Sequence, residues 1–117
     1  MAIVNSELQQ ELQNYKDSSV KFTQYYPNMN IVFSTLYERQ LQGILDLFEK
    51  EEQGSSSKFK LYLDTVIINM QSKIEKYKQS IYFDDENVKD IENQGYIIPF
   101  YEDKKKNIYV LLGIIKE

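Results

Sequence analysis

Hydrophobic residues are densest in residues 87–115, and their pattern predicts the strands around which the rest of the chain is organised. Residues 108–115 are almost uninterrupted apolar residues, which is typical of a strand buried on both faces. Residues 96–101 are aromatic and β-branched, a composition that strands favour. A charged turn at residues 102–107 joins these two strands, and a shorter apolar–polar alternation at residues 88–91 predicts a third.

The strand at residues 108–115 is expected to lie at the centre of the sheet, because both of its faces are apolar. Its predicted neighbours are residues 96–101 on one side and a short strand at residues 30–33 on the other. Pro99 has no N–H to donate, so its strand needs a bulge or an unpaired side at that point. Gly113 lies inside the last strand and predicts a bulge or the close approach of a helix.

Two amphipathic helices are predicted between these strands. Ser34 or Thr35 is expected to cap the first helix, with Glu38 as the capping-box partner of Thr35. The second helix begins after Gly54, and its apolar residues recur at helical spacing as far as Tyr77. The apolar face of the first helix comprises Tyr37, Leu41, Ile44, Leu45 and Phe48. The two helices form a hairpin that we expect to pack on one face of the sheet, leaving the other face free for a partner.

An additional helix and strand are predicted ahead of this unit. Ser6 is expected to cap the helix. Residues 20–26 alternate as a strand does, and Pro27 ends the pattern. The apolar stripe of the helix comprises Leu8, Leu12 and Tyr15. The predicted fold class is therefore α+β, a helical hairpin on a small, mostly antiparallel sheet in the order β-α-α-β-β-β, with an N-terminal helix and strand added.

Composition narrows the chemistry that this chain can perform. Its 117 residues, 42% of them hydrophobic, suit a single folded core. The absence of Cys and His removes thiolate chemistry, the commonest general base and the commonest transition-metal ligand. We therefore expect no cofactor and no metal. A formal net charge of −4 gives no overall attraction to nucleic acid. Without Cys, a signal-peptide pattern or 18 consecutive apolar residues, the sequence predicts a cytoplasmic protein with no membrane association.

Three pieces of residues 29–116 resemble the RelE/ParE superfamily of bacterial toxins. The first is N-I-V-F-S-T-L-Y-E-R-Q-L at residues 30–41, a strand that runs directly into a capped helix. The second is I-Y-F-D-D-E-N-V-K-D-I at residues 81–91. The third is Q-G-Y-I-I-P-F-Y at residues 94–101, followed by N-I-Y-V-L-L-G-I-I-K at residues 107–116. Their order and spacing together carry the resemblance.

The resemblance implies the toxin of a two-gene, type II toxin–antitoxin module, with residues 29–117 as the toxin domain. The expected partners are a cognate antitoxin, which wraps the helices or lies along the sheet, and a cellular target. That target is DNA gyrase for ParE-like members and the ribosome for RelE-like members. The exposed sheet face also suggests pairing with a second copy of the chain. The side chains expected to contact a partner are Tyr37, Leu41, Tyr96, Phe100 and Tyr101.

RelE-like members cut mRNA on the ribosome, which requires a base for the 2′-hydroxyl and cations for the developing phosphate charge. Lys89, Tyr96 and Lys116 are the candidate catalytic residues in this chain. The family often has Arg at the positions of Lys89 and Ile97, and its aromatic and basic tail is missing after Ile115. The toxin domain carries a net charge of −3, since two basic and three acidic residues precede it, whereas ribosome-directed toxins are usually basic. We therefore expect a ParE-like toxin that binds its target, with an mRNA endonuclease or an inactive interaction protein as alternatives.

Residues 1–28 are additional to the family pattern. Their helix and strand resemble the C-terminal arm of an antitoxin. The hypothesis is that this segment docks on its own sheet or helices, or on those of a second copy. The alternatives are a disordered extension and an ordinary helical cap on the domain.

Three other features have a functional and a structural interpretation. Residues 104–106, all Lys, could contact phosphate, although a solvated turn beside two acidic residues is favoured. Residues 84–86 are acidic but lack the alternating spacing of a calcium loop. Strand tyrosines could stack on bases, although half-buried packing with a solvated hydroxyl is favoured. These tyrosines are Tyr82, Tyr96, Tyr101 and Tyr109.

Overall fold

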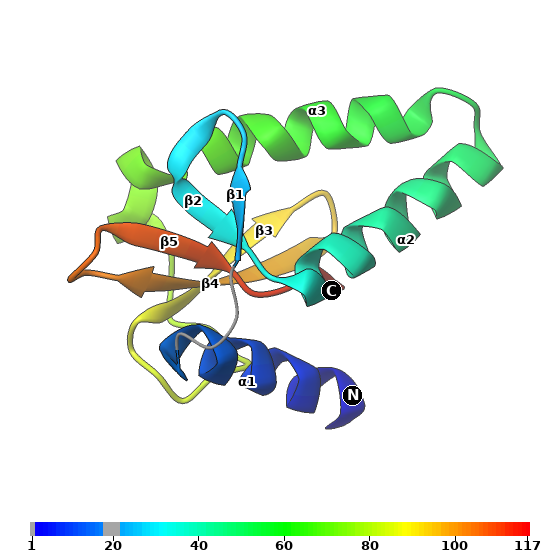
Figure 1. The fold of residues 1–117 in the computed structure, drawn as a ribbon. Coiled ribbons are helices and arrows are strands. Elements are labelled where there is room, and N and C mark those ends of the chain that lie inside the picture. The colour runs from blue at the N-terminus through cyan, green and yellow to red at the C-terminus, as the bar shows by residue number, and fades with distance from the viewer. Residues whose placement is uncertain (1, 18–21) are drawn as a thin grey trace.

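The computed structural model describes residues 2–17 and 22–117 and has an α+β fold (Figure 1). In these residues the helices are α1 (Ala2–Asp17), α2 (Thr35–Glu51), α3 (Ser55–Ile68) and the 3₁₀ helix η1 (Met70–Lys76). The strands are β1 (Thr23–Tyr25), β2 (Asn28–Phe33), β3 (Val88–Asn93), β4 (Tyr96–Asp103), β5 (Ile108–Leu111) and β6 (Ile115–Lys116). The predicted fold class is confirmed. None of the helices in these residues is long and apolar enough to cross a membrane.

The strands form one mixed sheet in the order β1-β2-β5-β4-β3. Strand β6 pairs with the beginning of β4, on the edge that β5 leaves unpaired. The β2–β5 pair is parallel, whereas the other pairs are antiparallel. Strand β5 lies between β2 and β4, so the predicted central strand and both of its predicted neighbours are confirmed. Val110 on β5 stands opposite Val32 on β2 and Tyr101 on β4.

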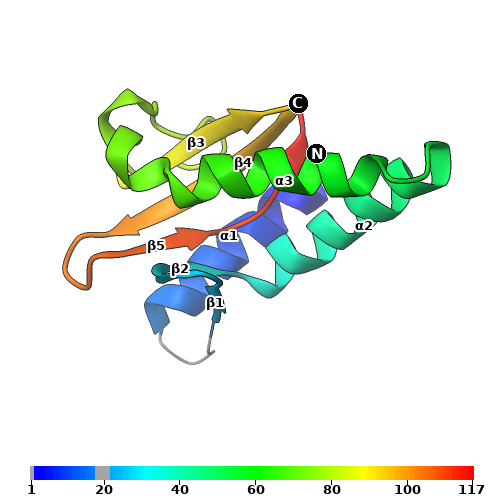
Figure 2. The ribbon, with the colours of Figure 1, turned by 90° about the horizontal axis from the view of Figure 1, so that it is seen from above.

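The helical hairpin of α2 and α3 covers one face of the sheet, as predicted (Figure 2). Its buried side chains pack against those of β3, β4 and β5 in one cluster. From the helices these are Tyr37, Phe59, Leu63 and Ile67, and from the three strands Ile91, Tyr96, Ile98, Phe100, Tyr109 and Leu111. Ser34 caps α2, because its Oγ accepts a hydrogen bond from the Tyr37 N–H at 2.9 Å.

Helix α1 covers the opposite face of the sheet, and the prediction that this face is free for a partner is wrong. Leu8 and Leu12 of α1 are buried in a second cluster with side chains from the strands, from the first turn of α2, from the loop before β3 and from the segment after β5. Those partners are Val32, Leu36, Phe83, Val88, Val110 and Leu112. In Figure 1 α1 lies on one side of the sheet and α3 on the other. Helix α1 therefore packs on its own sheet, which fits both the docking hypothesis and the alternative of an ordinary helical cap on the domain.

Some predicted boundaries differ from the structure. Helix α1 begins at Ala2, so Ser6 lies within the helix and is not its cap. Helix α3 ends at Ile68 and the chain continues as the 3₁₀ helix η1, whereas the sequence predicted one helix as far as Tyr77. Of the predicted strand at residues 20–26, Thr23–Tyr25 form a strand, and Val20 and Lys21 lie outside the described residues. Helical spacing of apolar residues persists through η1, which explains why the pattern missed the break.

The sheet is interrupted where β5 passes Pro99. Phe100 pairs with Leu111 of β5, and Ile97 pairs with Ile115 of β6, so Pro99 has an unpaired side as predicted. The Pro99 carbonyl accepts a hydrogen bond from the Leu112 N–H at 2.9 Å. In the same interruption the Ile114 N–H donates to the Gln40 Oε1 at 2.9 Å, which links the sheet to α2.

Gly113 lies in this interruption because a helix approaches it closely, as the sequence predicted. A Cβ added to Gly113 would lie 2.5 Å from the Leu8 Cδ2 and 2.9 Å from the Gln40 Oε1. These distances are shorter than a van der Waals contact, so a side chain here would push against both α1 and α2. The absence of a side chain at residue 113 thus allows both helices to reach the sheet.

We predict that Gly113→Ala lowers the free energy of unfolding by about 1–3 kcal/mol, because the added methyl group overpacks the Leu8 contact. Urea unfolding followed by circular dichroism measures the change. The matched control is Gly43→Ala in α2, where an added Cβ meets no atom within 4 Å. This control should raise stability by about 0.5–1 kcal/mol, because Ala favours the helix. Equal stability of Gly113→Ala and the unmodified chain would contradict the close packing of α1.

A double-mutant cycle with Leu8→Ala assigns the Gly113→Ala penalty to a particular contact. Leu8→Ala alone should cost about 2–5 kcal/mol, because Leu8 is fully buried. In the Leu8→Ala background most of the Gly113→Ala penalty should disappear, because the truncated side chain leaves room for the methyl group. Penalties that simply add would show that Leu8 does not lie against Gly113.

Candidate functional site

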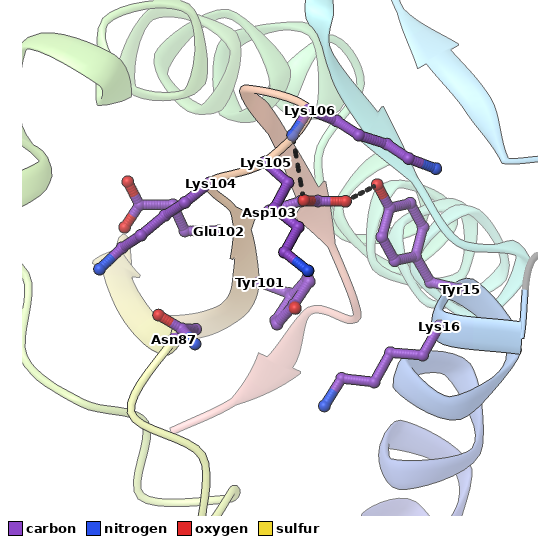
Figure 3. Close-up of a pocket in the computed structure, with 9 residues that line it drawn as sticks. All are labelled: Tyr15, Lys16, Asn87, Tyr101, Glu102, Asp103, Lys104, Lys105 and Lys106. Atoms are coloured by element: carbon purple, nitrogen blue, oxygen red, sulfur yellow. Dashed lines mark hydrogen bonds between the residues drawn. The ribbon is translucent and has the colours of Figure 1, made fainter.

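A pocket of about 370 Å³ lies between the C-terminal end of α1 and the β4–β5 hairpin (Figure 3). Helix α1 supplies Tyr15 and Lys16, and Asn87 comes from the loop before β3. Strand β4 and the turn after it supply the other lining residues, which are Tyr101, Glu102, Asp103, Lys104, Lys105 and Lys106. The pocket exists because α1 docks on the sheet, since one of its walls is the last turn of that helix.

Tyr15 and Asp103 connect the two walls. The Tyr15 hydroxyl donates a hydrogen bond of 2.7 Å to the Asp103 Oδ2, and the Lys106 N–H donates one of 3.2 Å to the Asp103 Oδ1. The Tyr15 ring also packs against Phe22 and Tyr101, with ring centroids 5.5 Å and 5.9 Å apart. The hydrogen bond to a charged carboxylate and the contact with Tyr101 thus hold α1 against the hairpin, and Phe22, just before β1, packs on the same Tyr15 ring.

The Tyr15–Asp103 pair is a fixed hydrogen bond rather than a proton-transfer pair. Burial raises the pKa of Tyr15 far above its ordinary value, and the hydrogen bond to Asp103 raises it further. Burial tends to raise the pKa of Asp103, but the hydrogen bonds from Tyr15 and from the Lys106 N–H outweigh it, so that pKa is lowered. At neutral pH the hydroxyl is therefore protonated and the carboxylate charged.

Lysine side chains surround this hydrogen bond. The Lys16 Nζ lies 3.0 Å from the Asp85 Oδ2 and 5.3 Å from the centroid of the Tyr101 ring. The Lys106 Nζ lies 5.9 Å from the centroid of the Tyr15 ring. Within residues 2–17 and 22–117, the ion pairs do not include the lysines of the hairpin turn, Lys104, Lys105 and Lys106. These three lysines are thus not ion-paired within the described residues, although the charge of Lys106 helps to lower the pKa of Asp103.

The three candidate catalytic residues do not converge on one site. Tyr96 and Lys116 are paired across β4 and β6, with the Lys116 Nζ 5.8 Å from the centroid of the Tyr96 ring. Lys89 instead stands opposite Phe100, four residues along β4 from Tyr96. Its Nζ donates a hydrogen bond of 3.1 Å to the carbonyl of Ile74 in η1. The same carbonyl also accepts a hydrogen bond of 3.3 Å from the Tyr77 N–H, so Lys89 adds a second donor at the end of η1.

The residues expected to contact a partner belong mostly to the core. The exposed fractions of Tyr37, Tyr96 and Phe100 are 1%, 6% and 0%. Leu41 is half-buried against the same cluster. Side chains with so little exposure reach a partner only if the helical hairpin first separates from the sheet. Tyr101 differs, because it is half-buried on the α1 face and lines the pocket.

The sequence prediction missed Tyr15, Lys16 and Asn87 as members of a site. The apolar stripe of α1 did place Tyr15 on the face that packs, and this was the available signal. The spacing of apolar residues in α1 does not indicate which face of the sheet this helix covers. It also does not indicate that Asp103 accepts a hydrogen bond from the Tyr15 hydroxyl. The acidic residues 84–86 serve in part as a charge partner, because Asp85 pairs with Lys16. The described residues contain no group of acidic side chains placed to hold a metal ion.

Comparison with known protein families finds no family model that matches the chain, and comparison with curated proteins finds no match. The functional argument therefore rests on the geometry of this chain.

We predict that Tyr15→Phe lowers the free energy of unfolding by about 1 kcal/mol at neutral pH, because the hydrogen bond to the Asp103 carboxylate is lost. Since the pKa of Asp103 is lowered in the folded chain, this bond stabilises the fold fully only above the ordinary carboxyl value of 3.8. The difference between the two proteins should shrink as the pH falls below that value and through the lowered pKa. Urea unfolding from about pH 7 to about pH 3 measures it.

The control for this series is Tyr62→Phe on α3, where the side chain is 63% exposed. It should leave stability unchanged across the same pH range. A Tyr15→Phe difference that stays constant down to the lowest pH would contradict a bond to the carboxylate form of Asp103.

Proposed function

We propose that this chain is a toxin of the RelE/ParE type that acts by binding a cellular target, as ParE-like toxins do, and does not act by cutting mRNA. Its expected partners are an antitoxin and a large target such as DNA gyrase. The observation that carries the proposal is the element order from β2 to β6. A strand leads into a helical hairpin, which covers one face of a sheet that later strands complete. This is the order that the resemblance implies. Because one fold can host different activities, the activity has to be argued from the side chains of the site.

The placement of the candidate catalytic residues supports binding over cleavage. Cleavage of RNA needs a base near the 2′-hydroxyl and cations near the phosphate. Lys89 is instead held by the carbonyl of Ile74, and Tyr96 is buried beneath Phe59. Lys116 lies beside Tyr96, but Lys89 lies elsewhere along β4 and does not provide a second cation at this point. These three residues therefore do not form a group that could act as the base and the cations of a ribonuclease.

Exposed apolar residues on the helical hairpin support a role in binding. Leu61 and Tyr62 of α3 are 67% and 63% exposed, and Ile68 is 41% exposed. Leu61 and Ile68 are two helical turns apart and therefore lie on the same face of α3. Apolar side chains gathered on one exposed face are a common mark of a surface that contacts another protein.

Helix α1 has the position of an inhibitory arm. Two of its leucines are buried against a sheet face that the β-α-α-β-β-β unit would otherwise leave open. We propose that α1 substitutes in part for a separate antitoxin by covering this face. The toxin would then be most active when α1 leaves the sheet.

Expression of full-length variants in a bacterium tests the toxin and the covering role together. We predict that Leu8→Asp with Leu12→Asp arrests growth more strongly than the unmodified chain, because charged side chains cannot stay in the buried cluster. The matched control is Gln10→Asp with Gln13→Asp, which adds the same charge to the exposed face of α1. This control should behave as the unmodified chain. Colony counts after induction measure the effect, and circular dichroism confirms that each variant is folded.

The outcomes separate the two parts of the proposal. Equal growth arrest by all three proteins would retain the toxin but contradict the covering role of α1. Normal growth with every variant folded and soluble would overturn the toxin. Gly113→Ala gives a milder test, because it should loosen α1 without adding a charge to the core.

Primer extension on cellular mRNA tests whether the arrest comes from cleavage. We expect no new cleavage products during arrest by the Leu8→Asp, Leu12→Asp variant, and we expect Lys89→Ala in that background to leave the arrest intact. Cleavage products that disappear in the Lys89→Ala variant would contradict the target-binding proposal and support ribonuclease activity.

A further inference from the structure

We propose that the pocket between α1 and the β4–β5 hairpin binds a compact anion with two or more phosphate groups, and that the bound anion holds α1 on the sheet. The shared chemistry is a short polyphosphate, either inorganic or the tail of a nucleotide. This site is separate from the exposed face of α3, and its existence does not depend on the proposed toxin activity.

The charge of the lining residues supports an anion. Four lysines line the pocket against two carboxylates, although the whole chain has a net charge of −4. The lysines come from two elements, with Lys16 on α1 and Lys104, Lys105 and Lys106 on the hairpin turn. Positive charge gathered in a concave part of an acidic protein raises the local concentration of anions there.

The two carboxylates of the lining offset only part of this charge, because four lysines line the same pocket. Asp103 is already engaged by the Tyr15 hydroxyl and the Lys106 N–H. Glu102 alternates with Tyr101 and Asp103 along β4, so its side chain points to the other face of the strand. Figure 3 shows Glu102 on the opposite side of the β4 ribbon from Tyr15. The Lys16–Asp85 ion pair is partly exposed, so it costs little to exchange for a phosphate.

Lys16 and Lys105 can reach one ligand, whereas Lys104 extends to the same side of β4 as Glu102 (Figure 3). Figure 3 shows Lys105 extending from the turn toward Tyr101, with Lys16 approaching from α1 below it. The Lys16 Nζ lies 5.3 Å from the centroid of the same Tyr101 ring. A phosphate chain lying along Tyr101 would therefore meet cations from both walls. The Asn87 side chain adds an amide that can donate a hydrogen bond.

Size and surroundings favour a small ligand over a long nucleic acid. The volume of about 370 Å³ lies at the lower end of the range for small-molecule pockets. A longer polyanion would have to pass the acidic residues 84–86 next to Asn87 and would meet an acidic protein overall. Repulsion from those charges grows with each additional phosphate outside the pocket.

A ligand held by both walls would stabilise the docked position of α1. Lys16 moves with α1, whereas Lys105 and Lys106 move with the hairpin. Because a ligand that binds only the docked arrangement shifts the equilibrium toward it, the polyphosphate should oppose release of the helix.

Isothermal titration calorimetry on the full-length chain at low salt tests the site, with sodium tripolyphosphate, ATP, AMP and a ten-nucleotide oligothymidine as probes. We expect tripolyphosphate and ATP to bind and AMP to bind at least about tenfold more weakly, because it carries a single phosphate. Lys105→Ala with Lys106→Ala should weaken tripolyphosphate binding about tenfold or more. The matched control is Lys50→Ala with Lys58→Ala, which removes the same charge from α2 and α3 and should change the affinity less than about twofold.

The probes also separate the sources of the phosphate. Equal affinity for ATP and tripolyphosphate would show recognition of the phosphate chain alone, and tighter binding of ATP would add recognition of the nucleoside. Tighter binding of the oligonucleotide than of tripolyphosphate would overturn the proposal in favour of single-stranded nucleic acid. An absence of binding, or equal weakening by both lysine pairs, would show that the pocket is not a specific site.

Amide hydrogen exchange provides the readout for α1. Tripolyphosphate should slow exchange in the last two turns of α1 in the unmodified chain and should not do so in Lys105→Ala with Lys106→Ala. Binding without any slowing would retain the site and overturn the link to α1. These measurements use purified protein, so a negative result here leaves the growth experiment unaffected, and normal growth there leaves this site unaffected.

Discussion

The structure depends on the burial of β5 from both sides. Tyr109 and Leu111 point into the core beneath the helical hairpin, whereas Val110 and Leu112 point into the cluster beneath α1. A strand that is apolar on both faces loses stability when either face is uncovered, because each buried aliphatic side chain contributes about 1.5–3 kcal/mol relative to exposure. The hairpin supplies one cover and α1 supplies the other. The N-terminal helix is therefore part of the packing, and its leucines occupy a surface that the sheet cannot leave bare without cost.

The two covers differ in how firmly they are held. The hairpin contributes a large aromatic and aliphatic set to its cluster, together with the hydrogen bond from the Ile114 N–H to Gln40. Helix α1 contributes only two buried leucines, and most of its other contacts are polar and lie at the rim. These are the hydrogen bonds Tyr15–Asp103, Gln9–Tyr82 and Leu36–Glu11 and the ion pairs Lys16–Asp85 and Arg39–Glu7. A smaller interface at the edge of a domain opens at a lower free energy than the rest of the fold. This contrast makes α1 the natural element for regulation, and it places the lysine pocket where a bound anion would have most effect.

Local patterns in the sequence predicted most of the fold and little of the site. The apolar run at residues 108–115 predicted the central strand, although only Ile108–Leu111 form it and the chain is interrupted before β6. The stripe of α2 predicted a helix that packs on the sheet. Tyr37 and Phe100 were correctly placed on apolar faces. Their large aromatic side chains suggested a contact with a partner, but the same side chains are buried in the core. Lys89 attracted a catalytic interpretation because it is a cation in a strand. The sequence did not show that η1 packs beside it and that its amine donates a hydrogen bond to the Ile74 carbonyl. The pocket escaped prediction because Tyr15 and Asp103 meet only after α1 has docked, and neither spacing nor charge indicates that face.

The parallel pairing of β2 with β5 also determines when the sheet can close. The Ser34 hydroxyl at the end of β2 donates to the carbonyl of Leu112, 78 positions away along the chain, at 2.7 Å. Until β5 inserts, β2 and β4 each present an open edge, although the β1–β2 and β3–β4 hairpins can already form from near neighbours. A contact at such separation forms late and slowly, because the entropy of closing the intervening loop must be met first. A growing chain would therefore carry the unprotected edge of β2 for much of its synthesis, because β4 and β5 are made last. That edge can associate with another chain at this stage.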